Sequence, residues 1–109
     1  MATFELRKSE NGEFHFALLN EQDKTVLRSE QYSTKAAAQN GIESVRKNAE
    51  NAARYELKTG NSGKFYFNLK AANGQVIGTS VMYAEEKARN DAATFVKEHA
   101  AQAGVVEDL

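Results

Sequence analysis

The two histidines are the first candidates for chemistry, because this 109-residue chain has no cysteine. A zinc site needs several imidazole, thiolate or carboxylate ligands held at short spacings. Neither His15 nor His99 has a histidine or acidic neighbour at a ligand spacing such as H-x-x-x-H. We therefore expect solvated histidines, no metal and no cofactor. The lack of cysteine excludes disulfides and thiolate catalysis.

A second candidate is the segment Ser33-Thr34-Lys35, where a helix could begin and bind a phosphate. Free backbone N–H groups and the helix dipole favour an anion at such a position. Helix capping is the simpler interpretation, because no glycine-rich loop precedes Ser33. Neither a G-x-S-x-G motif nor a phosphate loop occurs, and no acidic residue visibly pairs with a histidine, so we expect no enzyme.

The elements that would position these residues come from an internal duplication. Residues 2–52 align with residues 53–103 at an offset of 51 without a gap, with 13 identities in 51 pairs. A half of about 50 residues is near the lower limit for an independent core, so both copies should share one core. His15 aligns with Tyr66, which argues against two equivalent chemical sites.

Each copy predicts three strands followed by a helix. Thr3–Lys8 alternates apolar and charged residues, as a half-buried strand does. Asn11-Gly12 is a turn signal, and Glu13–Leu19 follows with apolar residues at every second position. An odd-length loop after this strand puts Val26 and its repeat equivalent Ile77 on the core face.

The first helix is predicted to follow an N-cap at Ser33 and to continue to about Ala49. Its equivalent covers roughly 85–102, with Gly104 as the predicted C-cap. The tail then continues the repeat, because residues 105–107 align with residues 54–56. We expect this tail to form a last strand that pairs with the other copy's part of the sheet.

If both helices lie on one side of the sheet, the other side is the remaining candidate for binding. Its predicted interaction residues are Arg7, His15, Leu19, Leu27, Lys58, Tyr66, Asn68 and Lys70. An aromatic residue among several bases is typical of platforms for single-stranded nucleic acid. Glu5 and Glu56 interrupt the basic surface, whereas the apolar surface of Leu19 and Leu27 favours a protein contact.

The stretches KAANGQVIGTSVMY (Lys70–Tyr83) and YSTKAAAQNGIESVRKNA (Tyr32–Ala49) resemble the duplicated members of the YegP-like family of small bacterial proteins. The resemblance implies two β-β-β-α-β units in one sheet, with C-terminal strands exchanged between the units. Single-repeat members would do this as homodimers. The resemblance implies no activity and no site residues, because the function of the family is unknown.

The expected architecture is an α+β fold of two tandem β-β-β-α-β repeats. They form one mainly antiparallel sheet with exchanged C-terminal strands and two helices on one face. We expect residues 1–109 to be a single pseudo-two-fold domain, a monomer that acts as a pseudo-dimer. Its parts are repeat 1 (2–52), repeat 2 (53–103) and a C-terminal strand (104–109).

Composition gives the expected setting and partners. The net charge is −1 and neither half is basic, which gives no electrostatic footprint for nucleic acid. No apolar run reaches the length of a membrane span, and residues 1–6 show no signal-peptide pattern. We expect a cytoplasmic bacterial protein that binds no membrane.

The leading hypothesis is a non-enzymatic protein-interaction module that binds an unknown protein partner through the open sheet face or a sheet edge. The alternative is a module that binds single-stranded nucleic acid on the same face.

Overall fold

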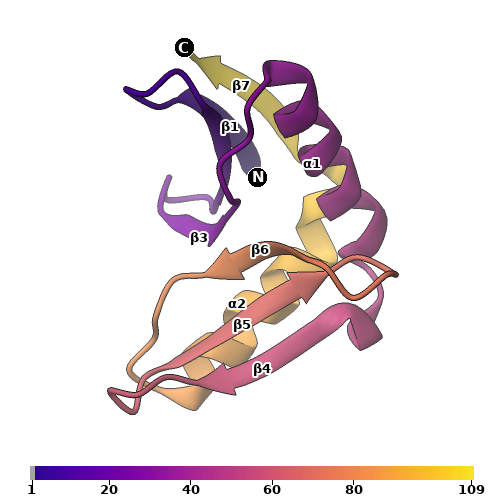
Figure 1. Cartoon of the computed structure of the whole chain (residues 1–109). Helices are drawn as coiled ribbons and strands as arrows, with labels where there is room; N and C mark the ends of the chain where they lie inside the picture. The colour runs from indigo at the N-terminus through magenta and orange to yellow at the C-terminus, as the bar shows by residue number, and fades with distance from the viewer. Residues whose placement is uncertain (1) are drawn as a thin grey trace.

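The computed structural model describes residues 2–109 as one seven-stranded sheet with two long helices (Figure 1). The elements in chain order are β1 (Thr3–Lys8), β2 (Phe14–Leu19), β3 (Thr25–Arg28), α1 (Lys35–Asn48), the 3-10 turn η1 (Ala52–Arg54), β4 (Tyr55–Thr59), β5 (Phe65–Lys70), β6 (Val76–Ser80), α2 (Glu86–His99), the 3-10 turn η2 (Ala100–Gln102) and β7 (Gly104–Asp108). The strand order in the sheet is β4-β5-β6-β3-β2-β1-β7. The predicted α+β fold is confirmed.

Each repeat contributes an antiparallel three-stranded meander, and the two meanders meet where β3 pairs antiparallel with β6. Ser29 and Ser80 hold equivalent places at this junction. The Ser29 hydroxyl accepts the N–H of Phe16 at 2.8 Å, and the Ser80 hydroxyl accepts the N–H of Phe67 at 2.9 Å. These matching hydrogen bonds explain why both copies have serine at this position.

Both helices pack on one face of the sheet around a shared core. Ile42 and Val45 of α1 and Val96 of α2 are buried together with the inward side chains of the strands. The largest fully buried side chains from the strands are Phe4, Leu6, Phe16, Leu18, Leu27, Phe67 and Leu69. Both repeats supply this cluster, so they share its hydrophobic stabilisation.

A β-bulge in β3 changes which side chains face the helices. Leu27 lies opposite Leu18, but Thr25 lies opposite Leu19, so Val26 is an extra residue between them. A bulge interrupts the alternation of side chains along a strand. Both Val26 and Leu27 are therefore buried in the helix-side core. The predicted core position of Val26 is confirmed, whereas the prediction that Leu27 lies on the outer face is wrong.

The equivalent bulge in β6 makes Ile77 the extra residue, and Ile77 is buried in the core as predicted. The turns before the two bulges reach a similar conformation with different residues. Asp23 has a φ of 59° at the position where Gly74 has a φ of 86°. Aspartate enters this left-handed region more readily than most residues with a side chain. Repeat 1 therefore forms the turn without a glycine.

The helix termini differ from the sequence prediction in two places. Thr34, not Ser33, is the N-cap of α1, and its hydroxyl accepts the N–H of Ala37 at 3.0 Å. Gly104 begins β7 rather than capping α2, because η2 carries the chain from the helix to the strand. Neither helix in residues 2–109 combines the length and apolar character needed to cross a membrane.

β7 pairs with β1, the first strand of the other repeat, as the alignment of the tail predicted, and the structure shows that the two strands run parallel. Its register places Val105 opposite Phe4 and Glu107 opposite Leu6. Glu107 also forms an ion pair with Lys35 of α1 at 2.8 Å. Figure 1 shows β7 beside β1, far from β4 at the other end of the sheet.

Candidate functional site

The centre of the sheet divides the predicted interaction face into two parts. Arg7 and His15 lie opposite each other on β1 and β2. The other polar residues of that prediction, Lys58, Tyr66, Asn68 and Lys70, lie on β4 and β5. β3 and β6 separate the two groups. The structure therefore does not bring the predicted residues into a single cluster.

Leu19 does not supply the apolar surface that the sequence predicted. It lies on the outer face between Thr3 of β1 and Thr25 of β3, and only 7% of it is exposed. Neighbours on both adjacent strands cover a side chain on a central strand. With Leu27 in the core, both leucines that favoured a protein contact on this face are buried. That part of the prediction is wrong.

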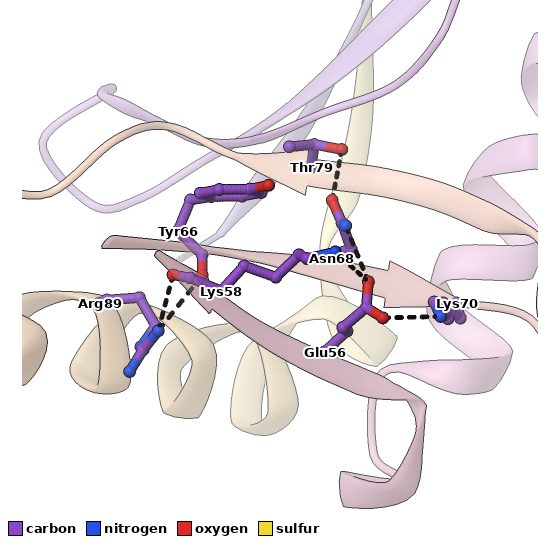
Figure 2. Close-up of polar contacts among 7 residues, drawn as sticks. All are labelled: Glu56, Lys58, Tyr66, Asn68, Lys70, Thr79 and Arg89. Carbon is purple, nitrogen blue, oxygen red and sulfur yellow. Dashed lines mark hydrogen bonds and ion pairs between the residues drawn. The ribbon is translucent and has the colours of Figure 1, made fainter. Parts of the chain in front are cut away.

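A polar cluster occupies the outer face of repeat 2 (Figure 2). The Glu56 carboxylate accepts a hydrogen bond from Asn68 at 3.1 Å and another from Lys70 at 3.0 Å. Lys58 lies 3.6 Å from the same carboxylate, and Thr79 donates to Asn68 at 2.9 Å. The hydrogen bonds from Asn68 and Lys70, helped by the charges of both lysines, lower the pKa of Glu56 against an opposing effect of desolvation.

This pairing weakens the case for a nucleic-acid platform on the outer face. Glu56 pairs with both Lys58 and Lys70, and Glu5 pairs with Arg7 in the other repeat. A phosphate backbone would have to compete with these carboxylates for each cation. Tyr66 supplies one ring for stacking, whereas platforms for single strands use several.

The two histidines have ordinary structural partners. His15 Nδ1 lies 3.0 Å from the Ser9 hydroxyl. The His99 ring packs on Phe95, with 4.7 Å between the ring centroids. Within residues 2–109, no group of three histidine or acidic side chains gathers at metal-binding distance.

The sequence hypothesis named a sheet edge in general, but it missed that the outer edge of β4 and Leu57 form that edge. β4 ends the sheet on one side, whereas its repeat equivalent β1 is covered by β7. Leu57 of β4 is consequently 53% exposed, while its equivalent Leu6 of β1 is 0% exposed. The sequence did contain a signal for this edge, because one tail strand cannot cover two equivalent edges.

A groove of about 300 Å³ lies between β4 and α2. Its lining residues are Ala52, Tyr55, Leu57, Asn90, Ala93, Thr94 and Lys97. The strand members Tyr55 and Leu57 offer apolar surface, whereas Asn90, Thr94 and Lys97 of α2 add hydrogen-bonding groups. The groove thus joins an apolar strip to a row of polar side chains.

The backbone of β4 adds hydrogen-bonding groups along the same edge. Phe67 directs its N–H to Ser80 on the β6 side, and Leu57 lies opposite Phe67. In an antiparallel ladder, two opposed residues direct their backbone groups either toward each other or away from each other. Leu57 therefore directs its N–H and C=O away from β5, to the position that a further strand would occupy.

Tyr55 fixes one end of the groove. Its hydroxyl donates to the carbonyl of Ala49 at 2.7 Å, and its ring centroid lies 5.8 Å from the Lys97 ammonium. Burial raises the pKa of Tyr55 above its ordinary value, so the hydroxyl stays protonated at neutral pH. The repeat equivalents of Tyr55 and Lys97 make a similar contact, because the Arg46 guanidinium lies 5.4 Å from the centroid of the Phe4 ring.

Arg89 fixes the other end of β4 from the helix side. This buried guanidinium donates from Nη1 to the carbonyl of Lys58 at 3.1 Å and to that of Tyr66 at 3.4 Å (Figure 2). Its Nη2 lies 3.5 Å from the carboxylate of Glu86, the first residue of α2. One side chain therefore joins the strand pair to the helix start and holds Glu86 close to β4.

A family model described as "Domain of unknown function (DUF1508)" matches the chain twice, over residues 9–56 and residues 61–107. The two matches correspond to the two repeats. The chain is 49% identical over 105 residues to the "UPF0339 protein in ptx operon 5'region" of Stutzerimonas stutzeri, covering 96% of this chain and 95% of that relative. It is 50% identical over 94 residues to the UPF0339 protein YegP of Escherichia coli K12, covering 86% of each chain.

Two solved structures have the same fold. The solution NMR structure of yegP from E. coli, described as a protein of unknown function, gives a TM-score of 0.92 at 45% identity, covering 98% of this chain and 92% of that one. The solution NMR structure of a UPF0339 protein from Shewanella oneidensis gives a TM-score of 0.92 at 42% identity, covering 97% and 90%. The resemblance seen in the sequence is confirmed, and the names of these relatives assign no activity.

Proposed function

Since this chain belongs to the DUF1508 family, whose function is unknown, we propose from its open β4 edge that it is a non-enzymatic protein-interaction module. Its ligand is an extended segment of a partner protein that adds a strand beside β4. Strand addition of this kind uses backbone hydrogen bonds for affinity and side-chain pockets for specificity. The observation that carries the proposal is β7, because the same chain already fills the equivalent edge of β1 with a strand.

The contrast between the two edges supports this proposal. Leu6 and Leu57 are equivalent leucines, yet only Leu6 is covered. A strand beside β4 would remove Leu57 from water, as β7 does for Leu6, and would satisfy the outward backbone groups of β4. Burial of apolar surface and pairing of these groups would both favour binding.

The chemistry of the groove supports binding rather than catalysis. Its polar side chains are Asn90, Thr94 and Lys97, and its lining includes neither a histidine nor a carboxylate that could activate the threonine. A larger groove of about 420 Å³ lies between the β2–β3 turn and α2. The β4 groove is the stronger candidate, because it lies along an edge strand whose backbone N–H and C=O groups at Leu57 point outward.

Selection from a library of displayed peptides tests the proposal. Peptides are selected on the wild-type protein and then measured against Leu57→Lys. Because the substitution puts a charge where the partner's apolar residues would pack, we expect affinity to fall at least about tenfold. Amide shifts in NMR spectra of the wild-type complex should map to β4 and the facing side of α2.

Val106→Lys is the matched control, because Val106 is 54% exposed on β7 and lies outside the groove. It should leave the affinity unchanged. Selected peptides that bind Leu57→Lys as tightly as wild type, or that shift amides elsewhere, would contradict the proposal.

The alternative function, binding of single-stranded nucleic acid, has less support because Glu56 pairs with both lysines of the outer face. Oligonucleotides included in the same titrations address it. Under that alternative, affinity should fall steeply with salt and should be lost in the double variant Lys58→Glu/Lys70→Glu.

A further inference from the structure

Resting on the proposed function, we propose that the ligand segment runs parallel to β4 and carries a bulky apolar residue opposite Tyr55 and a lysine or arginine opposite Leu57. The internal repeat supplies the template for this inference. β7 shows how a strand sits on the β1 edge, and the residues that differ between the two edges show how the ligand of β4 must differ from β7.

The direction and register follow from β7. β7 is parallel to β1, with Val105 opposite Phe4 and Glu107 opposite Leu6. Tyr55 and Leu57 are the repeat equivalents of Phe4 and Leu6. We name the two ligand positions P1, opposite Tyr55, and P3, opposite Leu57. P1 then corresponds to Val105 and P3 to Glu107.

The P1 position calls for a larger side chain than valine. At the β1 edge, Val105 and Ile42 of α1 line the same groove. The repeat equivalent of Ile42 is Ala93, which lines the groove beside β4. The smaller alanine leaves more room above Tyr55, and a bulkier apolar side chain at P1 would fill it. A close-packed contact needs that volume to be occupied.

The P3 position calls for a positive charge. Glu107 of β7 pairs at 2.8 Å with Lys35, the first residue of α1. The repeat equivalent of Lys35 is Glu86, the first residue of α2. Arg89 holds Glu86 near β4, and 66% of the Glu86 side chain remains exposed. A lysine or arginine at P3 would pair with this carboxylate, whereas a glutamate would face a like charge.

The same charge argues against a second copy of this chain as the ligand. If β7 of another copy bound to β4 in this register, its Glu107 would lie against Glu86. In addition, β7 is already paired with β1 of its own chain. The favoured ligand is therefore a basic, apolar segment of a different protein.

Synthetic peptides derived from β7 test the inference. One peptide has the sequence of residues 102–109, and the other carries Val105→Leu and Glu107→Lys. We expect the substituted peptide to bind the wild-type protein about fivefold more tightly, the ratio that corresponds to an exposed charge pair worth about 1 kcal/mol. In the Glu86→Lys protein the order of affinities should reverse. Glu85→Lys is the matched control, because Glu85 is the neighbouring exposed acid without a side-chain cap bond, and it should preserve the wild-type order.

Orientation is measured with a nitroxide at either end of the substituted peptide. A label on the amino end should broaden amide signals near Tyr55, and a label on the carboxyl end those near Thr59. The opposite pattern would overturn the parallel register. Equal binding of both peptides at β4, or no reversal in Glu86→Lys, would overturn the charge requirement.

These failures differ from a failure of the proposed function. If library-selected peptides bind at β4 but follow neither rule, the inference fails and the proposed function stands. If no extended peptide binds at β4, both fail.

Discussion

At the residue scale, the pseudo-two-fold junction shows why a duplicated sequence must diverge. Leu27 and Gly78 are repeat equivalents, and they meet where β3 pairs with β6. A Cβ added to Gly78 would lie 2.8 Å from Leu27 Cδ2 and 2.9 Å from Leu27 Cγ. The junction therefore has room for one leucine and not for two. A large residue in one copy fits a glycine in the other.

The substitution Gly78→Ala should lower the free energy of unfolding by about 1–3 kcal/mol, the usual range for overpacking a filled core. Denaturant unfolding followed by circular dichroism measures the change. Gly104→Ala serves as the control, because a Cβ at Gly104 would meet no atom within 4 Å, and its effect should stay within about 0.5 kcal/mol. In a Leu27→Ala background, Gly78→Ala should be much less destabilising. An equal loss in both backgrounds would contradict the packing argument.

Tyr55 links stability to alkaline pH. Its pKa is raised by burial, from an ordinary value of 10.0. The neutral hydroxyl therefore contributes stability below pH 10 that is lost as the pH rises toward the folded-state pKa, because the unfolded chain releases this proton first. The loss from this one group should approach about 1.4 kcal/mol per pH unit above pH 10.

Urea unfolding of wild type and Tyr55→Phe at several pH values checks this sign. The variant should be about 1 kcal/mol less stable at neutral pH, because it lacks the hydrogen bond to Ala49. The difference should shrink and then reverse above pH 10. The lysines of both proteins lose their protons in the same pH range, so their effect on stability cancels when wild type is compared with Tyr55→Phe. Parallel stability curves for the two proteins would contradict the prediction.

At the element scale, β7 and β4 show what a single strand does for an edge. Without a covering strand, Leu57 keeps about half of its surface exposed, whereas β7 leaves none of Leu6 exposed. β7 achieves this although both of its valines remain partly exposed. Its stabilising effect thus comes from the residues that it covers on β1.

Deletion of residues 105–109 should lower the free energy of unfolding by about 2 kcal/mol. Re-exposure of half of Leu6 and part of Phe4 accounts for this loss, reduced by the chain entropy that the tail regains. Thermal unfolding should show a decrease in Tm of roughly 10 °C. Val106→Ser, on the exposed outer side of β7, should change Tm by less than about 3 °C. An unchanged Tm after the deletion would contradict the covering role of β7.

The limits of sequence reasoning are also clearest at the element scale. Strand patterns, the helix stripes and the tail strand could be predicted, because each depends on local periodicity or on the repeat itself. The bulges could not, since one extra residue in β3 reverses the alternation and moves Leu27 to the other face. The Glu56 cluster depends on the register of three strands, which periodicity does not specify.

At the scale of the whole molecule, the sequence predicted the symmetric part of the structure, and the candidate site lies in its asymmetric part. Equivalent residues such as Ser29 and Ser80 accept equivalent hydrogen bonds from the backbone N–H groups of Phe16 and Phe67. The groove beside β4 exists because the tail covers one of two equivalent edges. The sequence prediction took the sheet face opposite the helices as the remaining candidate, and it favoured a protein contact there because Leu19 and Leu27 were expected to be exposed. Burial of both leucines removes that reason for a protein contact on the open face.

The asymmetry of the sheet also affects how copies of this chain can associate. A sheet polymerises head to tail when one edge strand of each copy pairs with the other edge strand of the next copy. The two edge strands here are β4 and β7, and both are exposed at the ends of the sheet. In the register that β7 adopts on β1, Glu107 of one copy would lie against Glu86 of the next. Like charges therefore oppose the head-to-tail contact, which lowers the tendency of the protein to polymerise edge to edge.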